Sequence, residues 1–155
     1  MELRSATTAD AADISALIHE LSHLFLARSG SKEAIAFHEA TSVQRIAEYI
    51  AGPNRIYVVA RVGAELAGFI SLKDRSRVSQ FFVCPHRQGK GVGRRLWNEA
   101  LARVGADEAS SFTVDSSRSA VPVYERFGFK VAGPVTEQGG VVFVPMRREP
   151  SPNDA

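Results

Sequence analysis

The segment Gln88-Gly89-Lys90-Gly91-Val92-Gly93-Arg94-Arg95 is the most informative stretch of this chain. It follows a strand-like run that ends near Val83 and precedes a helical pattern. Glycines let the backbone approach a ligand closely, and a helix N-terminus adds N–H groups and partial positive charge. Three alternating glycines among bases, with no acid, therefore predict a loop that binds a pyrophosphate.

Two other phosphate-binding loops do not fit this segment. A Walker-type loop needs a Lys-Ser or Lys-Thr pair after its spacer, and nothing here supplies one. A dinucleotide-binding fingerprint needs a third glycine where Arg94 stands, and an early strand–turn–helix unit around it.

Positive charge is concentrated around the loop. The whole chain carries only +2, yet residues 73–95 hold seven bases and the single acid Asp74, a net +6. Such a segment suits a phosphate-bearing cofactor, nucleic acid or an anionic surface as its partner. It equally suits exposure to solvent with no partner. Nucleic-acid binding favours aromatic side chains among the bases, whereas Phe81, Phe82 and Trp97 fall at expected core positions. A non-catalytic nucleic-acid or anionic-ligand binding module stays an alternative.

Length and composition indicate one ordinary globular domain. The chain has 155 residues, 45% hydrophobic and 23% charged. The single Cys84 excludes an internal disulfide framework and multi-cysteine metal sites. No apolar run approaches the roughly 20 residues of a membrane helix. We expect a cytoplasmic protein with no membrane or nucleic-acid partner, a folded domain over residues 1–148 and a flexible tail over 149–155.

Hydrophobic periodicity predicts a mixture of helices and strands in one sheet. After a short strand at 2–5, one helix is expected to end near Ser29-Gly30 and a second to cover about 33–50. Strands at 56–60, 66–72 and 78–83 form an antiparallel meander with a tight turn at Gly63. A helix with a buried stripe from Leu96 to Val104 follows. The remaining expected elements are strands at 111–114, 129–132 and 141–144 and a helix at 118–127.

Two segments together resemble the GNAT N-acetyltransferase superfamily. Gln88, Gly91 and Gly93 match its signature of Gln or Arg, two residues, Gly, one residue, then Gly or Ala. The run Tyr124-Glu125-Arg126-Phe127-Gly128-Phe129 is similar to the family's later helix end. The resemblance implies a GNAT-like α/β fold of the α+β type. Its mixed, mostly antiparallel central sheet would be flanked by about four helices and splayed between the fourth and fifth strands.

The resemblance also implies acetyl-CoA as cosubstrate, no metal, and an amine acceptor on a small molecule or peptide; homodimers are common in the superfamily. The pyrophosphate would lie on the backbone amides of Gln88, Gly89, Lys90, Gly91, Val92, Gly93 and Arg94. The pantetheine arm would pair with the backbone around Phe82 and Val83. Lys73, Arg75 or Arg77 is a candidate contact for the 3′-phosphate.

Tyr124 matches the family tyrosine beside the thioester sulfur, where a phenol protonates the departing thiolate. Asp115 stands where the related pattern usually has Asn, and helix capping, pantetheine binding and acid–base chemistry are its open roles. The general base is unassigned: the strand at 79–83 has no acid, which leaves water, Glu137 or a helix residue. Cys84 as an acyl-carrying nucleophile and a non-catalytic acyl-CoA sensor are further alternatives.

A competing pattern lies in the first helix. His19-Glu20-Leu21-Ser22-His23 has the His-Glu-x-x-His spacing of zinc proteases. The extended form of that motif would need Gly and His where Leu26 and Ser29 stand. Two other interpretations of these histidines are exposure on a polar helix face and contact with the acceptor.

Overall fold

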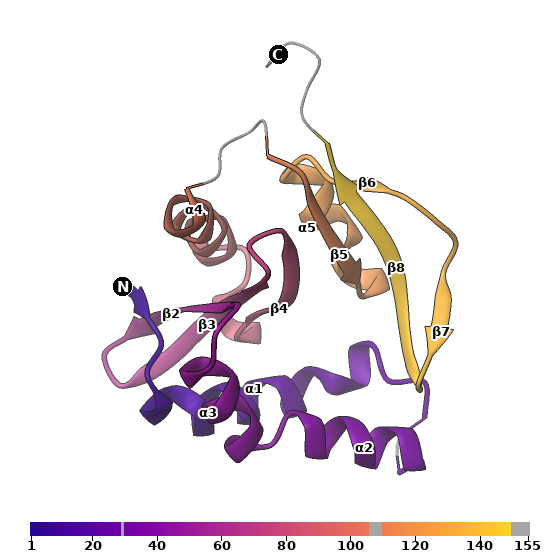
Figure 1. The fold of residues 1–155 in the computed structure, drawn as a ribbon, viewed down its shortest axis with the longest axis horizontal. Helices are drawn as coiled ribbons and strands as arrows, with labels where there is room; N and C mark the ends of the chain where they lie inside the picture. Colours follow the sequence, from indigo (N-terminus) through magenta and orange to yellow (C-terminus); the bar gives the residue numbers. More distant parts are fainter. Residues whose placement is uncertain (29, 106–109, 150–155) are drawn as a thin grey trace.

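The computed structural model describes residues 1–28, 30–105 and 110–149. One sheet runs through the molecule in the order β1-β2-β3-β4-β5-β8-β6, with β7 paired to β8 (Figure 1). The strands are β1 (Glu2–Ser5), β2 (Arg55–Val62), β3 (Glu65–Lys73), β4 (Arg77–Val83), β5 (Phe112–Ser116), β6 (Lys130–Val131), β7 (Thr136–Gln138) and β8 (Val141–Arg148). The α-helices are α1 (Ala11–Leu21), α2 (Lys32–Ala40), α3 (Val43–Ala51), α4 (Val92–Val104) and α5 (Val121–Arg126).

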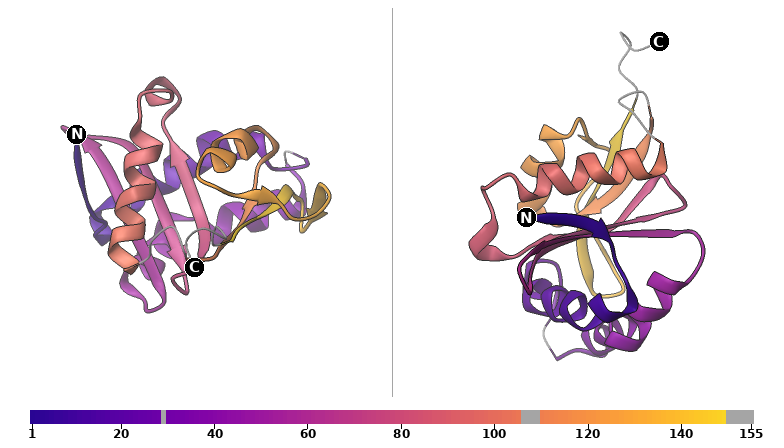
Figure 2. Two further views of the ribbon diagram at one scale, coloured as in Figure 1. Left: turned by 90° about the horizontal axis from the view of Figure 1, so that it is seen from above. Right: turned by 90° about the vertical axis from the view of Figure 1, so that its left-hand side faces the viewer.

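Helices cover both faces of the sheet and enclose two apolar cores. Helices α1 and α3 lie on one face, and α4 lies on the other (Figure 2). The first core joins Ile14, Ile18 and Ile46 to Phe69 of β3. The second joins α4 and α5 to the opposite face, with Trp97 and Phe112 among its buried rings. Within the described residues, no helix has both the length and the apolar character needed to cross a membrane.

The sheet opens between its fourth and fifth strands. β4 pairs with β5 in parallel only at Arg77↔Thr113 and Val78↔Val114, whereas the other named strand pairs are antiparallel. Past Val78 the two strands separate, so within the described part of the chain the β5-facing edge of residues 79–83 has no strand partner (Figure 1). The predicted mixed, mostly antiparallel sheet, its splay between the fourth and fifth strands and its antiparallel meander are confirmed.

The first helix is shorter than predicted. α1 ends at Leu21 and a 3₁₀ turn, Ser22–Leu24, follows it. The chain then pairs with β8: Leu26 forms a bridge with Val141, and the Val142 N–H donates to Phe25 O at 2.7 Å. Pairing with a strand far along the chain thus ends the helix, and the predicted end near Ser29-Gly30 is wrong; Ser29 itself lies outside the described residues.

The predicted helix over 33–50 is two helices, α2 and α3. At the break, Thr41 Oγ1 donates to Phe37 O at 2.8 Å, and Ser42 caps α3 by accepting from the Arg45 N–H at 3.3 Å. The strand β7 was not predicted. Of the tail predicted over 149–155, all but Glu149 lies outside the described residues.

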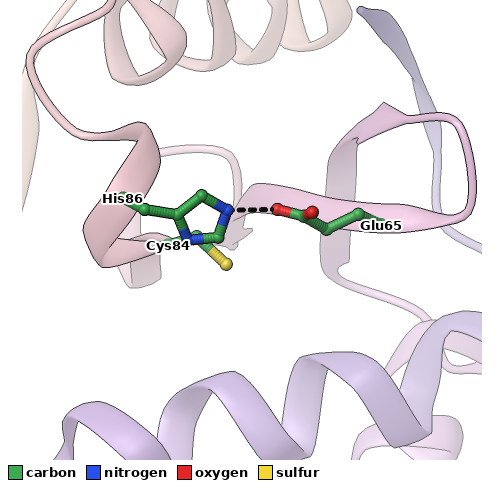
Figure 3. Close-up of side chains that lie close together, drawn as sticks. All are labelled: Glu65, Cys84 and His86. Atoms are coloured by element: carbon green, nitrogen blue, oxygen red, sulfur yellow. Dashed lines mark hydrogen bonds and ion pairs between the residues drawn. The ribbon is translucent and has the colours of Figure 1, made fainter.

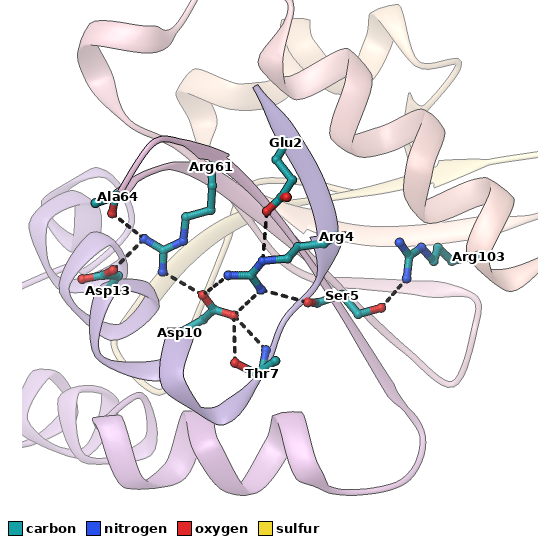
Figure 4. A network of polar contacts seen from close by, with 9 residues as sticks. All are labelled: Glu2, Arg4, Ser5, Thr7, Asp10, Asp13, Arg61, Ala64 and Arg103. Atoms are coloured by element: carbon teal, nitrogen blue, oxygen red, sulfur yellow. Dashed lines mark hydrogen bonds and ion pairs between the residues drawn. The ribbon is translucent and has the colours of Figure 1, made fainter.

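A buried carboxylate ties β1, β2 and the start of α1 together (Figure 4). Asp10 is 2% exposed, and it accepts hydrogen bonds from Arg4 at 2.8 and 2.9 Å, from Arg61 at 2.7 Å and from the Thr7 N–H at 2.8 Å. Burial alone would raise the pKa of Asp10. The bonds from Arg4, Thr7 and Arg61 outweigh burial and hold this pKa well below its usual range.

Asp10→Asn is expected to lower the free energy of unfolding by about 3 kcal/mol at pH 7, because it leaves two guanidinium groups facing a neutral amide. A lowered folded-state pKa stabilises the fold above the unfolded-state pKa of about 3.9 and loses that effect as the pH falls. The difference from wild type should therefore shrink below pH 4. Urea unfolding at pH 7 and pH 3.5 measures it. Asp13→Asn is the control: this carboxylate is 54% exposed and also pairs with Arg61, so about 1 kcal/mol or less is expected; equal losses would contradict the prediction.

Candidate active site

A cleft of about 760 Å³ opens where β4 and β5 separate. It brings together the two sequence segments that are far apart in the chain, the glycine loop and the region from β5 to α5. Of the predicted site residues, those that line it are Phe82, Val83, Gln88, Gly89, Gly91, Gly93, Arg94, Asp115 and Tyr124. Lys90 is exposed and Val92, the first residue of α4, is buried in the core, and neither is part of this lining.

The glycine loop joins the end of β4 to α4. Gly89 and Gly91 have φ of 75° and 83°, in the left-handed region that glycine tolerates best. Gly91 is the N-cap of α4, and the Arg95 N–H donates to Gly91 O at 3.1 Å. The amides of the first turn, from Val92 to Arg94, precede this bond and have no helical carbonyl behind them. The loop thus presents several N–H groups at the cleft, which suits an anionic ligand.

Hydrogen bonds to β4 and β3 hold the glycine loop and the turn before it in place. The Gln88 amide nitrogen donates to Val83 O at 3.0 Å. The Glu65 carboxylate accepts from Arg87 at 3.0 Å and lies 2.7 Å from His86 Nε2. The 3₁₀ turn Pro85–Arg87, just before the loop, is therefore fixed to the start of β3.

Cys84 lies beside this ion pair rather than in the cleft (Figure 3). Its thiol donates to Leu66 O at 3.1 Å, and burial raises the pKa of that thiol. The potential ligand atoms of Glu65, Cys84 and His86 lie within 4.8 Å of one another, but Arg87 already neutralises the carboxylate. A protonated thiol away from the cleft does not support Cys84 as an acyl-carrying nucleophile.

Tyr124 of α5 is 6% exposed and faces the cleft. Its ring packs edge-on against Phe81 and Phe129, at centroid distances of 6.1 and 5.4 Å. Burial raises the pKa of the Tyr124 phenol well above its usual value. The hydroxyl therefore keeps its proton at neutral pH and can donate a hydrogen bond.

Asp115 does not cap the following helix. It lies in β5, and Ser117 is the N-cap of the 3₁₀ turn that leads into α5. The Asp115 carboxylate accepts a hydrogen bond from Arg77 at 2.6 Å, so the predicted capping role is wrong. Arg77 also lines the cleft, whereas Arg75 donates to Val104 O at the end of α4.

Glu137, the candidate general base named from the sequence, does not line the cleft. Glu137 is in β7 and lines a separate hollow of about 240 Å³ together with Glu33. On β4, Gln80 lines the cleft and accepts a hydrogen bond from the Tyr57 hydroxyl at 2.9 Å. Among the described residues that line the cleft, Asp115 is the one acid.

The two histidines of the His-Glu-x-x-His pattern have different partners. His19 stacks on His38 at 4.6 Å, with its Nε2 2.9 Å from Thr41 Oγ1. His23 lies beyond the end of α1, with its Nδ1 3.1 Å from Glu20 O. They belong to no cluster of metal-ligating side chains within residues 1–28, 30–105 and 110–149. The structure therefore does not support a zinc-protease site.

Comparison with known proteins decides the family. A family model described as an acetyltransferase (GNAT) domain matches residues 26–150. The chain belongs to the GNAT acetyltransferase family. This confirms the GNAT resemblance of its two motifs, and the chain is an acetyltransferase of this family. It is 27% identical over 142 residues to the uncharacterized N-acetyltransferase YhfO of Bacillus subtilis (strain 168), covering 84% of this chain and 90% of the relative.

Solved structures share the fold of this GNAT chain. The PaiA N-acetyltransferase of Thermoplasma acidophilum, in complex with coenzyme A, has a TM-score of 0.75 at 19% identity, covering 96% of this chain and 98% of the other. An aminoglycoside 6′-N-acetyltransferase complexed with coenzyme A has a TM-score of 0.70 at 16% identity, covering 98% of each chain. At these identities the likeness concerns the fold.

One part of the cleft was not predicted from the sequence. Its lining includes side chains from α1, α2, the turn between them and β8: Ile18, Leu21, Leu24, Phe25, Phe37, Val141, Val142 and Phe143. In the sequence, Ile18, Leu21, Leu24 and Phe25 have the helical spacing of a buried core face. That spacing does not distinguish a residue packed in the core from one that faces a cleft.

Proposed function

We propose that this protein transfers the acetyl group of acetyl-CoA to a primary amine of a small molecule or peptide by direct attack in a ternary complex. The observation that carries the proposal is the single cleft at the β4–β5 splay, which has the glycine loop and the phenol of Tyr124 in its lining. We further propose that residues 1–148 form one catalytic domain.

The cosubstrate would be held mainly by backbone groups. The pyrophosphate would accept hydrogen bonds from the amides of residues 88–94, at the N-terminus of α4. The pantetheine arm would pair with β4 at Phe82 and Val83, because the β5-facing edge there lacks a strand partner. Arg77, held by Asp115 at 2.6 Å, is the candidate contact for the 3′-phosphate among the three bases predicted for it.

The chemistry requires proton movements at the amine nitrogen and at the thioester sulfur. The neutral amine, formed when the ammonium gives a proton to water, attacks the thioester carbon; a C–N bond forms and the C–S bond breaks. The nitrogen loses a second proton to water, and the departing thiolate takes one from Tyr124, whose buried phenol is protonated at neutral pH and regains its proton from water afterwards.

The bases of residues 73–95 give less support to the alternative functions. Three bases of the 73–95 segment are engaged: Arg77 with Asp115, Arg87 with Glu65, and Arg75 with Val104 O. They do not form the open cationic face that a nucleic-acid binding module would use. An acyl-CoA sensor would share the glycine loop but would have no need for a proton donor.

Calorimetry with acetyl-CoA and with a single-stranded oligonucleotide separates these functions. We expect saturable binding of acetyl-CoA and no binding of the oligonucleotide, because the loop amides suit one pyrophosphate and three of the bases are already engaged. A thiol-release assay with a panel of primary amines then distinguishes an enzyme from a sensor. Binding of the oligonucleotide alone would reject the proposed function, and acetyl-CoA binding without thiol release from any amine would favour a sensor.

A further inference from the structure

The cleft has an apolar end away from the glycine loop. Three aromatic rings from different elements meet there: Phe25 lies 5.2 Å from Phe37 of α2 and 5.9 Å from Phe82 of β4, measured between ring centroids. Leu21, Leu24 and residues 141–143 of β8 add further apolar lining. The backbone bonds between Phe25 and Val142 and between Ala27 and Gly140, both 2.7 Å, fix β8 against this part of the chain.

These rings pack against one another without being fully buried. Phe25, Phe37 and Phe82 are half-buried, and Leu24 is 43% exposed. Aromatic rings that line a cleft and are open to solvent leave apolar surface for a ligand to cover.

The charged side chains of the cleft come from elements other than α1, α2 and β8. Its charged lining in the described residues consists of Arg77, Arg87, Arg94, Arg126 and Asp115. These come from the glycine loop, the turn before it, β4, β5 and α5. Asp115 is paired with Arg77. Glu137 lies opposite Val142 in the strand register, but it and Glu33 line a neighbouring hollow rather than the cleft. A second ammonium group at the apolar end would be desolvated without a counter-ion in the described cleft lining, which is costly.

We propose that the acceptor is a monoamine whose single amino group is attached to an apolar, alkyl or aromatic body, and that polycationic amines are poor acceptors. This inference rests on the proposed function and specifies its substrate class. The apolar lining also favours the reactive species, because desolvation disfavours the ammonium form and so releases its proton to water.

Matched acceptors test the substrate class. Hexylamine and 1,6-diaminohexane differ by one amino group at the far end of the same chain, and phenethylamine and spermidine widen the comparison. With acetyl-CoA fixed and thiol release measured, kcat/KM for hexylamine and phenethylamine should exceed that for the diamine and spermidine about tenfold. Equal or inverted preference overturns the inference but leaves the proposed function standing, whereas no release with any amine overturns both.

Substitutions in the apolar end test the site. Phe37→Asp adds a carboxylate to the lining and should lower kcat/KM for hexylamine about fivefold, while kcat/KM for 1,6-diaminohexane stays level or rises. Leu24→Asp is a second variant at a more exposed position, which the fold tolerates better. Ile35→Asp is the control, since Ile35 is 54% exposed on the same helix and is not part of the cleft lining. If Leu24→Asp and Phe37→Asp leave the ratio of the two rates at the Ile35→Asp value, the inference is wrong.

Discussion

Tyr124→Phe is expected to lower kcat about a hundredfold while acetyl-CoA binding stays nearly unchanged. A positioned general acid contributes about a hundredfold to ten-thousandfold, and phenylalanine removes the proton while keeping the ring contacts with Phe81 and Phe129. Because burial holds the pKa of Tyr124 well above its usual value, the phenol stays neutral through pH 9. The loss should therefore be the same at pH 7 and pH 9, measured as kcat for thiol release at saturating amine.

Tyr49→Phe is the matched control. Tyr49 lies on α3, its ring contacts Arg55 at 4.0 Å, and it is not among the cleft-lining residues. We expect wild-type kcat for this variant. Calorimetry with coenzyme A separates chemistry from binding: an unchanged kcat for Tyr124→Phe would remove the proposed acid, and a fall in coenzyme A affinity matching the fall in turnover would assign Tyr124 a binding role instead.

Local patterns predicted the parts of the fold that depend on nearby residues. Alternating side chains and the turn at Gly63 were enough for the β2–β3 hairpin, and the apolar stripe was enough for α4. The end of α1 was missed because Leu24 and Phe25 continue its helical spacing, while the interaction that ends it is pairing with Val141. The division between α2 and α3 was readable in principle, since Ser42 is a favoured N-cap residue.

The candidate site likewise has parts that could be predicted from the sequence and parts that could not. The glycine loop is a local feature, and the motif around Tyr124 is contiguous, so both were found in the sequence. The Arg77–Asp115 ion pair depends on the register of β4 against β5, and the apolar end requires α2, β4 and β8 to meet. These contacts between distant segments decide what lies opposite the glycine loop, and hence which acceptor fits.

Gly91→Val is expected to weaken acetyl-CoA binding about tenfold. Gly91 has a φ of 83°, a conformation that costs an L-residue about 1–2 kcal/mol, and a branched side chain makes it harder still. Valine would relieve the strain by leaving this conformation, so the N-terminus of α4 would no longer direct its amides at the cleft. Binding would then have to restore the strained backbone, which accounts for about tenfold. No atom of the described residues lies within 4 Å of a Cβ at Gly91, so the isopropyl group would meet no protein atom and the expected loss comes from the backbone.

Gly63→Val separates this effect from strain in general. Gly63 has a φ of 60° in the β2–β3 turn, and a Cβ there also meets nothing within 4 Å. The two substitutions should therefore lower thermal stability by similar amounts, because they impose the same kind of strain at exposed turns. Titration calorimetry with acetyl-CoA should nevertheless show near-native affinity for Gly63→Val and a large loss for Gly91→Val. If both variants bind equally well, the amides at the start of α4 do not hold the pyrophosphate, and the cosubstrate must depend on side chains such as Arg77 and Arg94.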